Sequence, residues 1–75
     1  MPFDRDLDVK GLKCPLPILR TKKALAEMDA GQVLRVQATD AGSQKDFPAF
    51  AKQTGNELMS QQEENGVFVF FLKRR

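Results

Sequence analysis

One stretch of the chain carries residues whose types and spacing suit chemistry, and it reads Gly11-Leu12-Lys13-Cys14-Pro15-Leu16-Pro17. Cys14 is the only cysteine among 75 residues, and the chain has no histidine. An intrachain disulfide, a dithiol redox cycle and a Cys-His or Ser-His catalytic pair are therefore excluded. Zinc and haem sites draw on several cysteine or histidine ligands, so we expect no metal and no resident cofactor. What remains is a thiol that accepts a group, carries it and hands it on.

The residues beside Cys14 suit a reactive thiol. We expect Pro15 to be the first helical residue and Pro17 to lie in the same turn, where missing amide hydrogens cost nothing. This arrangement places Cys14 at the N-cap, where the helix dipole stabilises a negative charge by ~0.3–1 kcal/mol. Residues 9–26 contain no acidic side chain. We expect the dipole and the nearby cations to lower the pKa of Cys14 by about one unit. The cations assigned this thiolate-stabilising or partner-docking role are Lys13, Arg20, Lys22 and Lys23.

Plainer interpretations of these residues stay open beside the functional ones. A lone cysteine is commonly a small buried hydrophobic side chain, and the four cations could simply form a solvated helix face. Leu16 lies opposite the apolar stripe of the expected helix, so we expect it to be exposed beside Cys14. There Leu16, together with Leu19, would contact a partner. Asp40 and Asp46 are expected to cap or brace the turn before a second helix.

The elements that must position Cys14 follow from periodicity. Alternating apolar residues predict strands over residues 5–10, 32–39, 57–64 and 67–73, and helical spacing predicts helices over 15–29 and 43–54. The apolar face of the first helix comprises Ile18, Thr21, Ala24, Leu25 and Met28. Asn65-Gly66 predicts a type I′ hairpin turn between the last two strands. Pro48 is expected in the first turn of the second helix, with Asp46 as its N-cap, because proline is tolerated only there.

This element order, βαβαββ, predicts the fold class: an α/β (α+β) two-layer sandwich of two helices on a four-stranded mixed sheet. We expect one domain over residues 1–75, with its first two strands parallel. The last strand is apolar on both faces, which indicates either central burial or a dimer or partner surface. No apolar run is long enough to span a membrane, and residues 1–8 lack the apolar segment of a signal peptide. We therefore expect a cytoplasmic protein.

The segment Leu7–Pro17 resembles the Cys-Pro-x-Pro signature of the TusA/SirA-like sulfur-carrier proteins. The similarity covers nearly the whole chain and preserves its spacing. It continues through Thr21–Leu25, Gly31, Thr39-Asp40, Gly42-Ser43, Asp46–Pro48, Phe50, Gly55 and the closing Phe-rich strand. The fold of that family is also a βαβαββ two-layer sandwich, which agrees with the independent prediction from periodicity.

The resemblance implies that Cys14 is the catalytic residue of a sulfur relay and carries a transient persulfide. A donor such as a cysteine desulfurase or a rhodanese-like protein would load it, and an acceptor protein would unload it. Pathways served by the family include tRNA thiolation, molybdenum cofactor metabolism and sulfur oxidation. Two departures leave the pathway open. Asn56 stands where a histidine is frequent, and no second cysteine lies near Phe50-Ala51.

Two alternatives from other functional classes remain. The first is a non-catalytic regulatory or interaction module in which Cys14 only packs. The second is an RNA-binding module, which is weaker because a net charge of +2 is mild and no aromatic residues alternate with basic ones. We therefore do not expect direct nucleic-acid binding, and we expect a monomer or a weak dimer.

Overall fold

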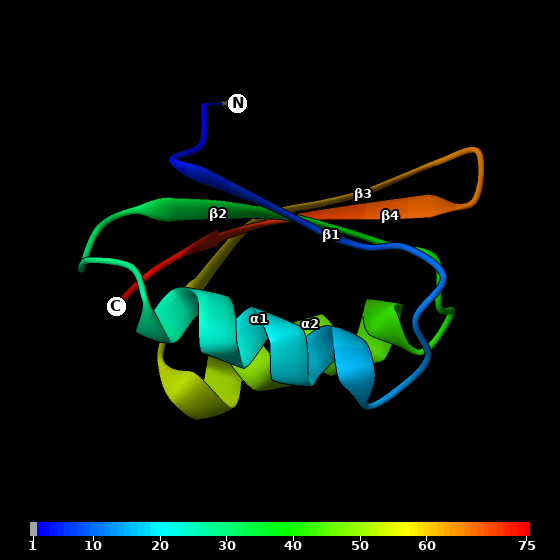
Figure 1. Ribbon diagram of the computed structural model, residues 1–75, viewed down its shortest axis with the longest axis horizontal. Helices are drawn as coiled ribbons and strands as arrows, with labels where there is room; N and C mark the ends of the chain where they lie inside the picture. The colour runs from blue at the N-terminus through cyan, green and yellow to red at the C-terminus, as the bar shows by residue number, and fades with distance from the viewer. Residues whose placement is uncertain (1) are drawn as a thin grey trace.

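The computed structural model describes residues 2–75 and has the predicted order of elements. These are β1 (Arg5–Val9), α1 (Leu16–Ala26), β2 (Val33–Ala38), α2 (Ser43–Thr54), β3 (Glu57–Glu64) and β4 (Val67–Lys73). The strands form one mixed sheet in the order β1-β2-β4-β3, in which β1 is parallel to β2 and β4 is antiparallel to both its neighbours. Both helices lie against one face of this sheet (Figure 1). The predicted two-layer architecture is therefore confirmed.

The core lies between the helices and the two central strands. Leu34, Val36 and Ala38 of β2 are fully buried, because alternate residues of a strand point to the same face. Phe47 of α2 stacks on Phe70 of β4, with ring centroids 4.2 Å apart and an interplanar angle of 13°. The predicted apolar face of the first helix is also confirmed, since its residues are buried or pack against the core, with Met28 lying just beyond the end of α1.

The opposite face of the sheet has no helix on it (Figure 1). Phe71 of β4 points to this face and is still only 8% exposed. The segment before β1 lies nearby, with the Phe3 ring 6.3 Å from that of Phe71. The guanidinium of Arg35 lies 4.4 Å above the Phe3 ring and also donates two hydrogen bonds to Asp6, of 2.9 and 3.0 Å. The apolar outer residues of β4 are thus partly covered within the chain.

The first helix is shorter than predicted. Pro15 is the N-cap, with φ −97° and ψ 10°, and Leu16 is the first helical residue. The helix ends at Ala26 rather than Asp29 because the next two amides bond to carbonyls three residues back, at 3.1 Å each. Such bonds tighten the last turn and stop an α-helix. The first two strands are also shorter than predicted, by one residue for β1 and by one at each end for β2.

The second helix has the predicted bounds but a different start. It begins at Ser43 with Gly42 as the N-cap, so the prediction of Asp46 as the N-cap is wrong, and Pro48 lies inside the helix. Proline has no amide hydrogen for the carbonyl four residues earlier, which belongs to Gln44. That carbonyl instead accepts a hydrogen bond of 3.2 Å from the side-chain amide of Gln61 on β3. This bond from the neighbouring strand offsets the bond that the helix loses.

The predicted hairpin turn between β3 and β4 is confirmed. Asn65 and Gly66 both have positive φ, of 53° and 80°, as a type I′ turn requires. No helix within residues 2–75 is long and apolar enough to cross a membrane.

Candidate functional site

The parallel pairing of β1 with β2 sends α1 and α2 back along the sheet in the same direction. The two helices therefore lie side by side with their N-terminal ends at one end of the molecule (Figure 1). The turn that carries Cys14 precedes α1 at this end, and Asp46 lies in the first turn of α2. Residues more than thirty positions apart in the sequence thus meet at one site.

Cys14 is exposed, in the turn just before the N-cap of α1. Its predicted place at the N-cap is wrong by one residue, because Pro15 takes that position after a turn closed by a 2.9 Å bond from the Leu16 amide to the Lys13 carbonyl. Cys14 is one of the residues that line a cavity of about 310 Å³ between the two helices. The residues lining this cavity are Cys14, Pro15, Ile18, Asp46, Ala49, Phe50 and Gln53.

The charges beside Cys14 are opposite to those predicted. The pKa of the thiol is raised, chiefly by its interaction with the Asp46 carboxylate. Partial desolvation and the negative charges of Asp46 and Asp40 act in the same direction. The expected lowering of this pKa is therefore wrong, because the topology brings two acidic residues of a distant segment to the thiol, and they outweigh the cations that neighbour it in sequence.

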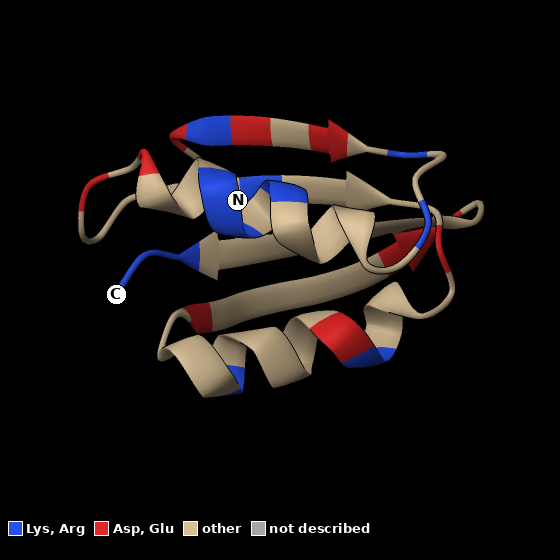
Figure 2. Cartoon of the chain, turned by 60° about the horizontal axis from the view of Figure 1, so that its bottom comes forward, with Lys and Arg blue, Asp and Glu red and all other residues tan. Residues whose placement is uncertain are grey.

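The structure separates the four predicted cations. Lys13 is exposed next to Cys14, whereas Lys22 faces the space between the helices. Arg20 and Lys23 line a different depression, on the side of α1 toward β1. The lysine and arginine residues of α1 are thus grouped in the middle of the helix and not at its start beside the thiol (Figure 2). None of them contributes to the pKa of Cys14, so the thiolate-stabilising role predicted for them is not supported.

The predicted position of Pro17 and the predicted exposure of Leu16 and Leu19 are confirmed. Pro17 lies at the start of α1, where it is buried, and its carbonyl accepts a 2.8 Å hydrogen bond from the Thr21 hydroxyl. Leu16 and Leu19 are exposed, as expected, at 42% and 54%. An apolar surface therefore adjoins the thiol on the outer side of α1.

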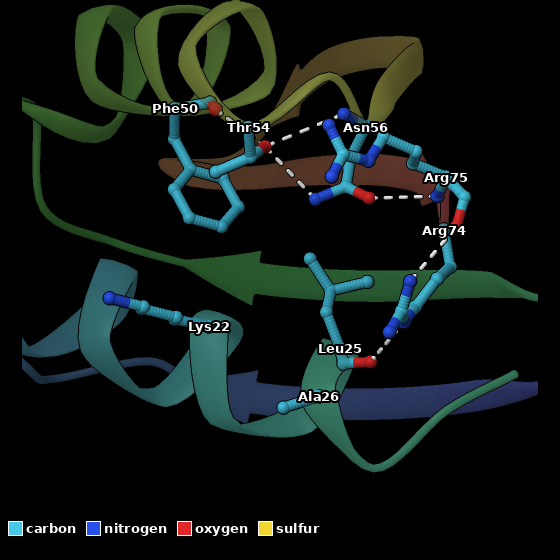
Figure 3. A pocket seen from close by; sticks show the side chains of 8 residues that line it. All are labelled: Lys22, Leu25, Ala26, Phe50, Thr54, Asn56, Arg74 and Arg75. Carbon is cyan, nitrogen blue, oxygen red and sulfur yellow. Dashed lines mark hydrogen bonds between the residues drawn. The ribbon is translucent and has the colours of Figure 1, made fainter. Parts of the chain in front are cut away.

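Sequence reasoning missed several residues that line the space between the helices. A second cavity, of about 190 Å³, lies between the C-terminal halves of α1 and α2 (Figure 3). Its polar residues include Thr54, Asn56, Arg74 and Arg75, and Phe50 lines both cavities. The topology could have indicated these residues, because two parallel neighbouring helices must share a groove along their length. Within residues 2–75, no group of three or more His, Cys, Asp or Glu side chains could hold a metal ion.

Comparison with known proteins places the chain in one family. The family model described as Sulfurtransferase TusA matches residues 5–74. The chain is 65% identical over 72 residues to the sulfur carrier protein TusA of Allochromatium vinosum, which covers 96% of this chain and 95% of that protein. It is 40% identical to the sulfur carrier protein TusA of Pseudomonas entomophila, over 96% and 90% of the two chains.

The structural comparison agrees with the sequence comparison. The crystal structure of a SirA-like protein from Desulfitobacterium hafniense superposes with a TM-score of 0.82 at 30% identity, covering 93% of this chain and 96% of that one. An exposed cysteine in a Cys-Pro-x-Pro turn, the βαβαββ sandwich that holds it and a family match over almost the whole length lead to one conclusion: the chain belongs to the TusA family of sulfur carriers.

Proposed function

We propose that Cys14 is the residue on which this sulfur carrier holds its cargo, as a persulfide. The observation that carries the proposal is the exposure of the only thiol in the chain, in the Cys-Pro-x-Pro turn, where Cys14 lines the first cavity. A buried cysteine could pack but could not meet a partner. The exposure of Cys14 therefore argues against the alternative of an interaction module in which this residue is structural.

The chemistry requires two thiol–disulfide-type exchanges. In the first, the Cys14 thiolate attacks the terminal sulfur of the donor persulfide, a new S–S bond forms, and the donor cysteine leaves as a thiolate that takes up a proton. In the second, an acceptor thiolate attacks the terminal sulfur of the Cys14 persulfide, and Cys14 leaves as a thiolate. One sulfane sulfur atom moves and no external electrons are needed. A single cysteine suffices because each partner supplies its own.

The surroundings of Cys14 support docking by a sulfur-donor protein, of the cysteine desulfurase or rhodanese-like class, and by an acceptor protein. Lys13, Leu16 and Leu19 form an exposed surface beside the thiol, with a cation next to apolar side chains. An exposed apolar surface with a charged rim is typical of a protein contact. We place this relay in the cytoplasm, where a lone exposed thiol stays reduced.

The proposal is tested by incubating the protein with a cysteine desulfurase and cysteine, followed by intact mass measurement with and without a reductant. We expect the wild-type chain to gain one sulfur atom, and we expect the reductant to remove it. Cys14→Ser should gain none. Absence of added sulfur on the wild-type chain, or equal addition to Cys14→Ser, would contradict the proposal.

A further inference from the structure

Two cavities follow one another between α1 and α2, and we call them together the interhelical groove. Phe50 is only 8% exposed and lines both cavities. Cys14 lines the first cavity, and the second lies between the C-terminal halves of the helices. The reactive thiol therefore stands at one end of an elongated site and not on an isolated patch.

The far end of the groove is positively charged. Lys22, Arg74 and Arg75 line it and no acidic residue does. Figure 3 shows Lys22 on the side of α1, with its side chain directed away from the two arginines. Arg74 is held in place by a 2.7 Å bond from its Nε to the Leu25 carbonyl and a 2.9 Å bond from its Nη1 to the main-chain oxygen of Arg75. Among residues 2–75, neither the Lys22 ammonium nor the Arg75 guanidinium has a carboxylate partner.

The position of Arg75 is fixed by its neighbours. Its amide donates a 2.8 Å bond to the Asn56 side-chain oxygen, and its side chain lies across Gly55, at which an added Cβ would stand 3.0 Å from the Arg75 Cδ. Gly55, which has φ +79° at the end of α2, therefore leaves room for this arginine. The C-terminal ends of the helices each bring about half a negative charge, whereas three side chains bring a full positive charge each. The positive charge prevails.

The acidic residues that act on the thiol, Asp46 and Asp40, thus lie at one end of the groove, whereas the other end is lined by three cations and no acidic residue. We propose that the interhelical groove binds an extended segment of the sulfur-exchanging partner, with the reactive cysteine of that segment at Cys14 and an acidic side chain beyond Phe50, in the basic end that Lys22 and Arg75 line. This inference rests on the proposed function of Cys14. The acidic residues at the thiol end disfavour the reverse orientation by like-charge repulsion.

The groove also fixes the spacing within the partner segment. Pro15 lines the first cavity and Lys22 lines the second, seven residues further along the chain at about 1.5 Å per helical residue. A span of about 10 Å corresponds to three or four residues of extended chain at roughly 3.3 Å per residue. The acidic side chain is therefore expected three or four residues from the cysteine of the partner.

The test uses short peptides whose ends are blocked and whose cysteine is activated as a mixed disulfide with thiopyridine, an uncharged leaving group. Cys14 attacks the cysteine sulfur of the peptide and releases the thiopyridine, which is followed by its absorbance. A peptide with Glu four residues from the cysteine should react about two- to five-fold faster than its Gln counterpart at low ionic strength, the range of an exposed ion pair. This advantage should disappear in the double variant Lys22→Gln/Arg75→Gln.

Arg20→Gln/Lys23→Gln is the matched control, because it also removes two positive charges, at residues of α1 that face the other depression. We expect it to keep the preference for Glu. A peptide with Glu placed next to the cysteine should show no advantage. Equal rates for Glu and Gln peptides on the wild-type chain, the same preference at every Glu position, or equal loss in Arg20→Gln/Lys23→Gln would overturn the inference.

A short RNA could also be added to the peptide assay. If this RNA binds the wild-type chain and abolishes the preference for Glu, but does not bind Lys22→Gln/Arg75→Gln, the basic end of the groove is a nucleic-acid site and the inference is overturned. Because the peptide assay needs no persulfide, its failure is distinguishable from a failure of sulfur loading. If the chain loads sulfur on Cys14 but shows no preference for Glu, the result contradicts the proposed binding of a partner segment in the groove and leaves the proposed function of Cys14 intact.

Discussion

The ionisation of one thiol governs the chemistry at the scale of the residue. Asp46 and Asp40 favour the protonated form of Cys14 and raise its pKa, so the free protein presents mainly a thiol at neutral pH. A thiol of higher pKa is a stronger nucleophile once it is deprotonated and a poorer leaving group once it carries sulfur. Under the proposed function, the acidic neighbours would therefore make the unloaded carrier slow to react with small oxidants and the loaded carrier slow to lose its sulfur.

Asp46→Asn should make Cys14 more reactive at pH 8. Removing the carboxylate lowers the pKa of the thiol toward its ordinary value, so the thiolate fraction at that pH increases. Intrinsic nucleophilicity falls with a Brønsted slope of only about 0.4–0.5, so the gain in thiolate prevails. The measurement is the rate of alkylation by iodoacetamide between pH 6 and 10, with the midpoint of the profile at lower pH in the variant.

Asp29→Asn serves as the control, because this exposed residue lies in the turn after α1, at the end of that helix remote from the thiol. It should leave the alkylation profile unchanged. A profile for Asp46→Asn that coincides with that of the wild-type chain would show that Asp46 does not govern the thiol.

At the scale of the elements, α2 depends on a neighbouring strand. Pro48 leaves the Gln44 carbonyl without its helical partner, and Gln61 of β3 supplies the missing hydrogen bond. A hydrogen bond of this kind contributes about 0.5–1.5 kcal/mol net. The bond also ties the first half of α2, which carries Asp46 and Phe47, to the sheet.

A double-mutant cycle tests this dependence by urea unfolding. Gln61→Ala should lower the free energy of unfolding by about 1 kcal/mol in the wild-type chain. The same change should cost almost nothing in a Pro48→Ala background, because the restored amide hydrogen then satisfies the Gln44 carbonyl. Gln62→Ala, on the same strand, should show no coupling to position 48. Equal costs of Gln61→Ala in both backgrounds would contradict this account of the proline.

The pairing of β1 with β2 gives the protein an acid-sensitive contact. Arg35 holds Asp6 by two hydrogen bonds and lowers the pKa of that carboxyl, an effect that burial opposes. A lowered pKa in the folded state adds stability above the unfolded pKa, and this stability is lost as the pH falls through the folded value. Because the Asp6 side chain is 38% exposed, the contribution is discounted for screening to about 0.5 kcal/mol.

Asp6→Asn should therefore reduce the free energy of unfolding by about 0.5 kcal/mol at pH 7 and leave it almost unchanged at pH 2. The measurement is urea unfolding at both pH values. Glu63→Gln removes an exposed carboxylate of β3 that has no ion-pair partner among residues 2–75, and it should have no such effect. A deficit of Asp6→Asn that persists at pH 2 would show that the ion pair is not its cause.

At the scale of the whole molecule, periodicity was sufficient for the architecture. The alternation in β2 and β4, the helical stripe of α1 and the positive-φ pair Asn65-Gly66 predict their elements because each depends on local geometry. The helix ends were predicted less well. The start of α1 depends on a turn around Cys14, and the fit of Pro48 depends on a strand thirteen residues away in sequence.

The residues of the site differ in the same way: those within one contiguous motif were predictable from the sequence, and those brought together only by the fold were not. Cys14 and its prolines were identified because the motif is contiguous, and the exposure of Leu16 followed from the helical stripe. The acidic environment of the thiol was missed because Asp46 reaches it only through the parallel arrangement of the two helices. Arg75 was missed for the same reason, since it lies at the groove only after β4 crosses the sheet.

The most direct test of the central claim follows a labelled sulfur atom through Cys14 in a single turnover. The protein is loaded by a cysteine desulfurase with cysteine that carries a heavy sulfur isotope, separated from the donor and mixed with a thiol acceptor. Samples are then trapped by alkylation and mapped by peptide mass. We predict one labelled sulfur per chain on the peptide that contains Cys14, lost at the rate at which the acceptor gains it. Label on any other residue, or transfer by Cys14→Ser at the wild-type rate, would contradict the claim.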